Sequence, residues 1–156
     1  MDPRRALSKL TPGTMSLTMG SGPGEYSQAD VAAALGGLDP LSANLVMVKW
    51  SGHDSGYLKL LLMSRIADRA IREKWKLRKG DLTAMTNVAV AEYLYRRDDA
   101  QPGLSERKRA LASGVPRSRW RRHITHLYLK HQTEITWLLN DSENRALSHI
   151  KRLLAG

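Results

Sequence analysis

Two histidines on one expected helix could hold a metal ion. His123 and His126 are spaced i, i+3 in this 156-residue chain, so both project from one face of a helix. His131 lies about 140° round the same helix from His126 at 3.6 residues per turn, so it cannot complete a tight site. We therefore expect no metal here, and we expect these histidines to contact phosphates or solvent.

A second group of polar residues has the types of a catalytic triad. His53 and Asp54 lie between Ser51 and Ser55. A triad needs a base that is oriented by a third group from elsewhere in the fold, and one loop cannot supply that geometry. We therefore expect a turn and a helix cap at this position.

The chain lacks the other common signatures of catalysis. It has no cysteine, no phosphate-binding loop, no dinucleotide fingerprint and no clustered carboxylate pair that would hold catalytic magnesium. We expect no cofactor and no enzymatic activity. An RNA-modifying or RNA-cleaving enzyme stays a weak alternative because no site for it is visible.

The charge of the chain points to a different kind of function. Lys and Arg number 25 against 15 Asp and Glu, a formal net charge of +10. Residues 104–131 alone hold eight basic and one acidic side chain. A solvated helix face usually mixes both signs, and this segment does not. Such an excess of positive charge most often serves a nucleic-acid partner.

The basic segment has the spacing of a helix-turn-helix. Ala110 is a small residue where two helices would cross, and Gly114, four residues later, tolerates the positive φ of the turn. Pro116 suits the first position of the second helix. Trp120 and Ile124, spaced i, i+4, would anchor that helix on the core.

This motif predicts which residues contact DNA. The N-terminal side chains of a recognition helix reach base edges in the major groove, and the preceding helix meets phosphates. The predicted contact residues are Arg107, Lys108, Arg109, Arg117, Ser118, Arg119, Arg121 and Arg122. Arg109 and His123 stand where apolar residues are usual in this motif. An Arg-rich solvent face of a helical hairpin and an RNA-binding surface are the alternatives.

A second cluster of basic residues ends the expected middle helix. It comprises Arg69, Arg72, Lys74, Lys76, Arg78 and Lys79, with Glu73 among them and Asp68 directly before them. Cations at a helix C-terminus complement the helix dipole, which is the plain interpretation. The functional interpretation is a second electropositive surface for RNA or an acidic partner. Trp75 within the cluster is either a core anchor, which we favour, or an interface aromatic.

The elements that must position these residues are all helical. No strand pattern is visible, and the chain is predicted to be all-α with six or seven helices. We expect a flexible arm over 1–24, a helical body over 25–97, and a helix-turn-helix with closing helices over 104–156. The expected helices cover 27–35, 40–50, about 55–79, 81–97, 105–113, 116–139 and a last helix after a break at 140–142.

Glycines and apolar periodicity set the details of these helices. Gly80 is expected to stop the middle helix and Asp81 to cap the next one. The residues expected to face the core are Tyr57, Leu58, Leu61, Leu62, Ile66, Leu82, Met85, Val88, Ala89, Tyr93, Leu147, Ile150, Leu153 and Leu154. No apolar run is long enough for a membrane helix, so we expect a cytoplasmic protein without membrane contact.

Three blocks of the chain resemble a known family. These are Glu106 to Arg122, the trailing helix to Leu139, and the block from Tyr26-Ser-Gln-Ala-Asp30 to Trp50. In arrangement they look like the Q-type late-gene antitermination proteins of bacteriophages, and like the AlpA-like antiterminators of bacterial lysis cassettes. Some proteins of this type carry cysteine zinc ligands. The cysteine-free chain resembles the zinc-free branch.

The resemblance implies a mechanism and partners. Such a protein binds double-stranded DNA near a promoter, loads onto RNA polymerase paused with sigma, and narrows the RNA exit channel so that terminator hairpins do not form. On this view the chain from Ser105 onward reads DNA, and the helices between Ser27 and Arg97 contact the polymerase. The second basic cluster would then face nascent RNA or the surround of the exit channel.

Two other DNA-binding functions fit the same motif. A repressor or activator would need a dimer to read a two-fold operator, and the last helix could supply that dimer face. A phage DNA-packaging recognition subunit also has a helix-turn-helix, usually near its N-terminus, whereas here about 100 residues precede the motif.

Overall fold

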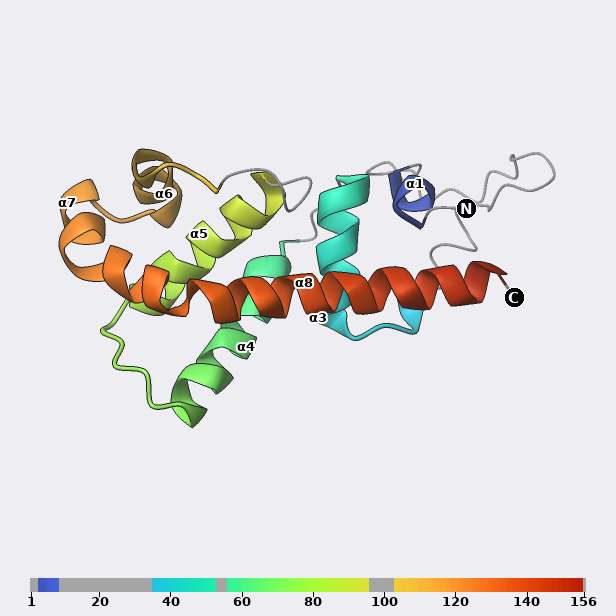
Figure 1. The fold of residues 1–156 in the computed structure, drawn as a ribbon, viewed down its shortest axis with the longest axis horizontal. Coiled ribbons are helices and arrows are strands. Elements are labelled where there is room, and N and C mark those ends of the chain that lie inside the picture. The colour runs from blue at the N-terminus through green and yellow to red at the C-terminus, as the bar shows by residue number, and fades with distance from the viewer. Residues whose placement is uncertain (1–2, 9–34, 53–55, 96–102, 156) are drawn as a thin grey trace. The chain divides into compact units, whose positions relative to one another are not determined.

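Helices make up every regular element in the described part of the chain. The computed structural model describes residues 3–8, 35–52, 56–95 and 103–155 (Figure 1). The all-α expectation is confirmed for these residues. Most of the expected first helix over 27–35 and most of the loop over 98–103 lie outside them. The contacts divide the chain into two compact units, unit 1 (1–58 and 140–156) and unit 2 (59–139).

Unit 1 contains short helices on a long one. Its helices are α1 (Pro3–Ser8), α3 (Pro40–Val46), the π-helix η1 (Met47–Ser51) and the C-terminal part of α8 (Thr125–Ala155). The Asp39 carboxylate accepts a hydrogen bond from the Ser42 backbone N–H and caps α3 at Pro40, as a proline-started helix requires. Gly52, at φ +73°, ends η1 where the sequence predicts.

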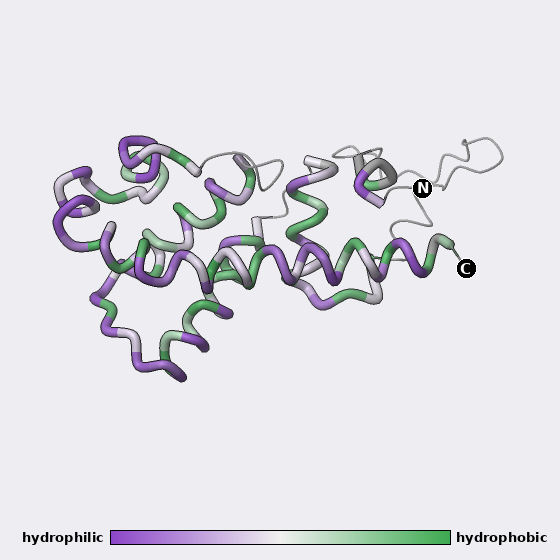
Figure 2. The backbone as a smooth tube through the Cα atoms, in the orientation of Figure 1, coloured by the Kyte–Doolittle hydropathy of each residue, from purple (hydrophilic) through white to green (hydrophobic). Residues whose placement is uncertain are grey.

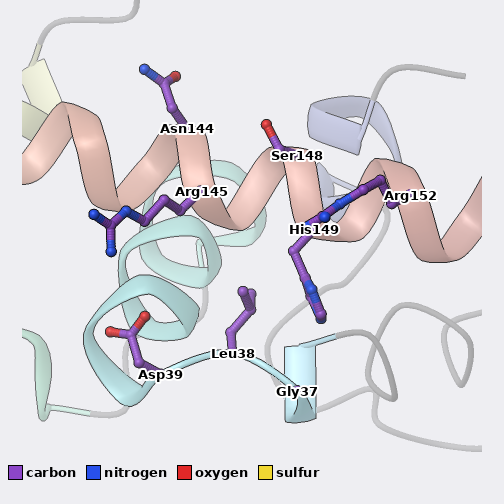
Figure 3. A pocket seen from close by; sticks show the side chains of 8 residues that line it. All are labelled: Gly37, Leu38, Asp39, Asn144, Arg145, Ser148, His149 and Arg152. Atoms are coloured by element: carbon purple, nitrogen blue, oxygen red, sulfur yellow. The ribbon is translucent and has the colours of Figure 1, made fainter.

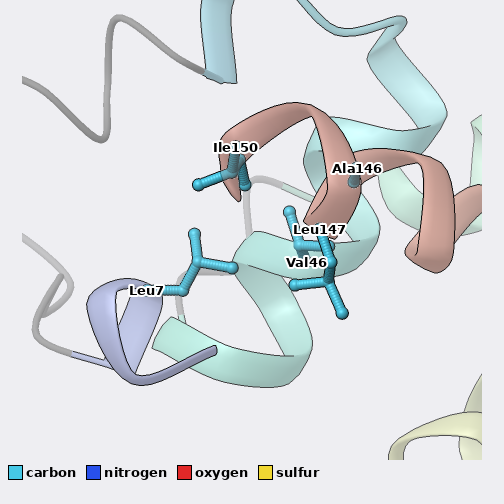
Figure 4. Close-up of a cluster of buried hydrophobic side chains, with 5 residues drawn as sticks. All are labelled: Leu7, Val46, Ala146, Leu147 and Ile150. Carbon is cyan, nitrogen blue, oxygen red and sulfur yellow. The ribbon is translucent and has the colours of Figure 1, made fainter. Parts of the chain in front are cut away.

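The core of unit 1 joins residues from both ends of the chain. It comprises Leu7, Val46, Ala146, Leu147 and Ile150, all buried (Figure 4). Leu7 is fully buried although the sequence predicts a flexible arm over 1–24. Residues 3–8 therefore form a packed helix, because α1 places Leu7 in this apolar cluster.

The predicted helix break at 140–142 is wrong. Helix α8 runs without interruption from Thr125 to Ala155. Asp141 and Arg145 form an i, i+4 ion pair of 2.9 Å, which supports the helix at the point where a cap was expected. The apolar face continues through Leu139, Ala146 and Ile150, which are buried, but it stops before Leu153, which is 53% exposed.

Unit 2 consists of five helical segments and the first part of α8. They are α4 (Leu58–Arg72), α5 (Asp81–Tyr95), α6 (Glu106–Ser113), α7 (Arg117–Arg119) and the π-helix η2 (Trp120–Ile124). The expected inward faces of α4 and α5 are largely confirmed: Leu62, Ile66, Met85 and Val88 are buried. Tyr57 was also expected to be buried, but it precedes α4 and is 62% exposed.

Helix α4 ends earlier than Gly80, and its end has a different chemistry from the expected glycine stop. The backbone N–H of Trp75 donates to the Ala70 carbonyl, and that of Lys74 to the Ile71 carbonyl. These are the two hydrogen bonds of a Schellman motif, with Lys74 at φ +57° in the position that glycine usually takes. The sequence could not predict a lysine in that conformation from composition.

Asp81 does not cap α5 in the expected direction. It is the first residue of the helix, and its carboxylate accepts a hydrogen bond of 2.7 Å from the backbone N–H of Arg78 in the preceding loop. Gly80, at φ +88°, supplies the carbonyl that receives the Ala84 N–H. The buried carboxylate of Asp81 therefore fixes the loop that enters α5.

The expected boundary at 98–103 falls inside unit 2. Helices α5 and α6 lie on either side of it and pack together (Figure 1). The Asn87 side-chain amide on α5 donates to the Ser113 carbonyl at the end of α6, at 3.1 Å. None of the helices in the described ranges combines the length and apolar character needed to cross a membrane.

Candidate nucleic-acid interface

The segment from α6 to η2 forms two helical stretches joined by a tight turn. The Ser105 hydroxyl accepts from the Lys108 backbone N–H and caps α6. Gly114 ends α6 at φ +78°, in the left-handed region that the sequence predicts for it. The Ser113 hydroxyl accepts from the Val115 N–H within the turn. The next helical stretch begins at Arg117, so Pro116 is its N-cap and not, as the sequence predicts, its first residue.

Two buried side chains, one aromatic and one aliphatic, anchor the second stretch on the rest of unit 2. Trp120 and Ile124 are fully buried, as predicted, and the Trp120 ring lies 5.7 Å from that of Tyr128. Ala110 on α6 is also buried. Residues 120–124 form a π-helical turn, a widened geometry that is frequent at functional sites.

Burial of these anchors leaves the polar side of the second stretch in solvent. Arg117, Ser118, Arg121 and Arg122 are exposed, and Arg121 lies 3.6 Å from the exposed Glu106. An exposed ion pair of this kind contributes little to stability and is easily exchanged for a phosphate. These four side chains therefore form the outward face that base and phosphate contacts would need.

Arg109 does not join that face, although the sequence predicts a phosphate contact for it. Its Nε donates to Glu92 Oε1, and both side chains are largely buried. Its guanidinium also lies 5.6 Å from the centre of the Tyr128 ring, and Gln132 donates to the other Glu92 oxygen at 3.0 Å. The polar residue at an apolar position is explained by this ion pair, which joins α5, α6 and α8.

Arg119 is partly exposed, with 42% of its side-chain surface in solvent, but its guanidinium has contacts within the unit. Its Nη2 donates to the Lys79 carbonyl oxygen at 2.7 Å and lies 3.9 Å from Asp81 Oδ1. Asp81 is 1% exposed, so this guanidinium is the nearest positive charge to a buried carboxylate. The structure therefore engages the guanidinium of a predicted base-reading residue in a surface contact that connects the turn region with the loop before α5.

The second basic cluster divides between a helix end and this loop. Arg72, Lys74, Lys76, Arg78 and Lys79 are exposed. Arg69 is half-buried between two carboxylates, with its Nε 3.3 Å from Glu73 Oε1 and 3.2 Å from Glu134 Oε2. Only Arg69 is therefore engaged in the ion-pair role that complements a helix end.

Trp75 is half-buried and attaches the loop to α8. Its ring stacks on that of His131 with centroids 3.7 Å apart, and its Nε1 donates to Glu73 Oε2 at 2.9 Å. The expectation of a core anchor is met in part, because the ring is neither in the central core nor fully exposed. His131 is buried by this contact.

Three titratable groups around Trp75 are shifted by their surroundings. Burial lowers the pKa of His131, and the nearby Lys130 charge lowers it further. Burial raises the pKa of Glu134, with the hydrogen bond that its protonated form donates to Glu73 acting in the same direction. Burial alone would raise the pKa of Glu73, but hydrogen bonds from Glu134 and Trp75 and the charge of Arg69 lower it.

Acidification is expected to loosen the Trp75 contact. Because the pKa of His131 is lowered on folding, its neutral form stabilises the fold above the ordinary histidine pKa, and this stabilisation is lost as pH falls below that value. The melting temperature should therefore fall between pH 7.5 and 5.5 by more in the wild type than in His131→Gln. Because the pKa of Glu134 is raised on folding, acidification increases stability through this group, and it does so equally in both proteins. If the melting temperature fell equally in the two proteins, the titration of His131 would not contribute to the loss of stability.

The two basic groups lie on the same unit. Unit 2 holds 18 of the 25 Lys and Arg residues and 8 of the 15 Asp and Glu, so the whole net charge of +10 belongs to it. Unit 1 holds seven of each sign. Figure 2 shows hydrophilic stretches at α6, at α7 and along the loop between α4 and α5.

Comparison with known proteins gives no relative. No family model matches this chain, and no curated protein or solved structure matches it. The resemblance to antitermination proteins therefore stays a prediction that rests on the arrangement of the motifs.

Unit 1 has a groove of its own. It is open and lies between the turn at Gly37–Asp39 and one side of α8 (Figure 3). The α8 residues that line it are Asn144, Arg145, Ser148, His149 and Arg152. Arg145 is engaged with Asp141, and unit 1 has no net charge. The groove therefore lacks the charge density of the basic face on unit 2.

Proposed function

We propose that unit 2 binds double-stranded DNA, with α6, the Gly114 turn and the stretch from Arg117 acting as a helix-turn-helix. The observation that carries this proposal is the outward arginine face on a helix whose opposite side is anchored by Trp120 and Ile124. A rigidly anchored helix with exposed arginines at its N-terminus suits insertion into the major groove.

The roles within this interface follow from exposure. Arg117, Ser118, Arg121 and Arg122 contact base edges or the adjoining phosphates, because they occupy the start of the second stretch. Arg107 and Lys108 on α6 are exposed and contact the phosphate backbone of the DNA. Arg109 and Arg119 hold the interface in shape through Glu92 and through Lys79 and Asp81.

Transcription antitermination is the proposed use of this binding. It is supported by the resemblance of the motif arrangement, and by a near-neutral unit 1 that is free of the DNA-binding charge. RNA polymerase with sigma is then the second partner. A read-through assay with purified polymerase, a terminator template and the full chain tests this role. Unchanged termination would leave a plain repressor or activator as the function.

Binding to DNA should be strongly salt-dependent. If the interface neutralises about six phosphates, the slope of log K against log salt should be near −5, at about −0.9 per phosphate. The measurement is fluorescence anisotropy of a labelled 24-bp mixed-sequence duplex between 50 and 300 mM salt. Selection from a random duplex library then shows whether a preferred sequence exists. A flat salt dependence would rule out the proposed interface.

A further inference from the structure

A groove separates the second basic cluster from the start of α8. It has a volume of about 370 Å³, within the range of small-ligand pockets. Lys76 and Arg78 line one side, and His123 and His126 line the other. These four side chains come from two groups that are separate in the sequence, the second basic cluster and the histidine pair, and unit 2 brings them together.

The loop that forms one side of the groove is held at three points. The Schellman hydrogen bonds fix its start at Lys74 and Trp75. The Trp75 ring stacks on His131, on the same helix that carries His126. The Lys79 carbonyl accepts from Arg119, which lies between the exposed Arg117 and Arg121 along the chain. A basic loop fixed in this way is presented beside the proposed DNA-reading helix.

The carboxylate of Asp81 also lines the groove, and its negative charge would repel a bound anion unless other groups offset it. Asp81 is buried, and its Oδ2 accepts from the Arg78 backbone N–H. Its other oxygen faces the Arg119 guanidinium at 3.9 Å. Arg119 and the Arg78 N–H thus offset the negative charge only in part, because Asp81 Oδ1 accepts no hydrogen bond from the described residues. The ammonium groups of Lys76 and Lys79 remain in solvent.

We propose that the 74–79 loop is a second contact on the same DNA, with a backbone phosphate seated between Lys76 and Arg78 on one side and His123 and His126 on the other. Arg119 is a positioning residue that holds this loop, and it does not read a base. The inference rests on the proposed function, and it replaces the expectation that the second cluster serves a separate partner.

Salt titration separates this second contact from the helix-turn-helix. The full chain, Lys76→Ala/Lys79→Ala and Lys59→Ala/Lys151→Ala are titrated against the same 24-bp duplex. Loss of the one phosphate contact in the groove should make the slope shallower by about 0.9, whereas the control, which removes the same charge from exposed lysines elsewhere, should change it by less than half as much. Both double variants change exposed side chains, so their folding is not at issue.

Chemical protection tests the role of Arg119. Acetylation of lysines is followed by mass spectrometry with and without the duplex, in the wild type, Arg119→Ala and Arg119→Lys. We expect DNA to protect Lys76, Lys79 and Lys108 in the wild type and only Lys108 in Arg119→Ala, with partial recovery in Arg119→Lys. Intact protection of the loop in Arg119→Ala, together with lost sequence preference, would restore Arg119 as a base reader and overturn the positioning role.

The outcomes distinguish this inference from the proposed function. If the wild type binds no duplex, the proposed function fails and the inference fails with it. If the wild type shows a steep slope of log K against log salt, and Lys76→Ala/Lys79→Ala keeps that slope, only the proposed second DNA contact is wrong. If the loop lysines are protected by a single-stranded RNA of the same length and not by the duplex, the loop serves a different nucleic acid and the inference is overturned.

Discussion

Replacing Arg117 and Arg122 together by alanine should remove most of the affinity for a selected duplex. Each is exposed at the start of the second helical stretch, where a bidentate contact to a base contributes about 1–3 kcal/mol. The double variant should therefore lose about 2–6 kcal/mol, roughly 30-fold to 20,000-fold in Kd. Titration of the selected and a scrambled duplex measures both the affinity and the sequence preference.

The control for this prediction removes two arginines from the neutral unit. Arg145→Ala/Arg152→Ala lowers the net charge by the same amount at exposed positions of α8 in unit 1. Its affinity should stay within a few-fold of the wild type at 150 mM salt, where charges beyond about 8 Å are screened. If both double variants lost the same affinity, binding would follow net charge and not the arginine face.

The local chemistry of the turn was predictable from the sequence. Gly114 at positive φ and the buried pair Trp120 and Ile124 follow from residue type and spacing, and the helix start is predicted to within one residue, at Pro116 where the structure has Arg117. These features depend on a few neighbouring residues. The same is true of the all-helical composition, because apolar periodicity is itself local.

The positions of Arg109 and Arg119 were not predictable in this way. Each is an arginine in a basic run, and nothing in that run shows that Glu92 or Asp81 lies beside it. The partners are 17 and 38 residues away in the chain. The one available signal was that Arg109 occupies a position where an apolar residue is usual, which indicates an inward-facing side chain with a buried acidic partner.

The predicted helix ends were wrong where tertiary contacts outweighed local conformational preference. The Asn140-Asp141-Ser142 run is a typical break, yet α8 continues because its apolar face is buried on both sides of it. Lys74 takes a conformation that glycine favours, at a cost of about 1–2 kcal/mol for a residue with a side chain. The stacking of Trp75 on His131 is a contact that can offset such a cost.

The distribution of charge changes the expected division of labour. The sequence predicts a DNA reader after Ser105 and a separate protein-contacting body before Arg97. In the structure the loop at 74–79 and the arginine face belong to one unit, joined by the Arg119–Lys79 hydrogen bond. A single continuous basic interface on unit 2 is therefore the simpler arrangement, and unit 1 is left as the candidate surface for a protein partner.

The Arg109–Glu92 pair is expected to contribute more to folding than any other polar contact of unit 2. Arg109→Ala would leave the Glu92 carboxylate buried with Gln132 as its only polar partner among the residues that the structure describes. Breaking a buried ion pair by removing one partner costs about 3–5 kcal/mol, because a buried charge is left uncompensated. Urea denaturation followed by circular dichroism should show this loss, and DNA affinity should fall only to the extent that the protein unfolds.

Replacing both partners decides whether Arg109 is structural. In Glu92→Leu/Arg109→Leu no charge is left buried, and well-packed apolar residues often match a buried ion pair in stability. We therefore expect the double variant to recover most of the stability lost in Arg109→Ala, and to bind the duplex with a salt slope close to that of the wild type. A phosphate-contacting Arg109 gives the reverse pattern: Arg109→Ala keeps its stability, and the slope becomes shallower by about 0.9 in both variants. Because the two patterns differ in both stability and slope, one set of proteins separates an arginine that holds α5, α6 and α8 together from one that touches DNA.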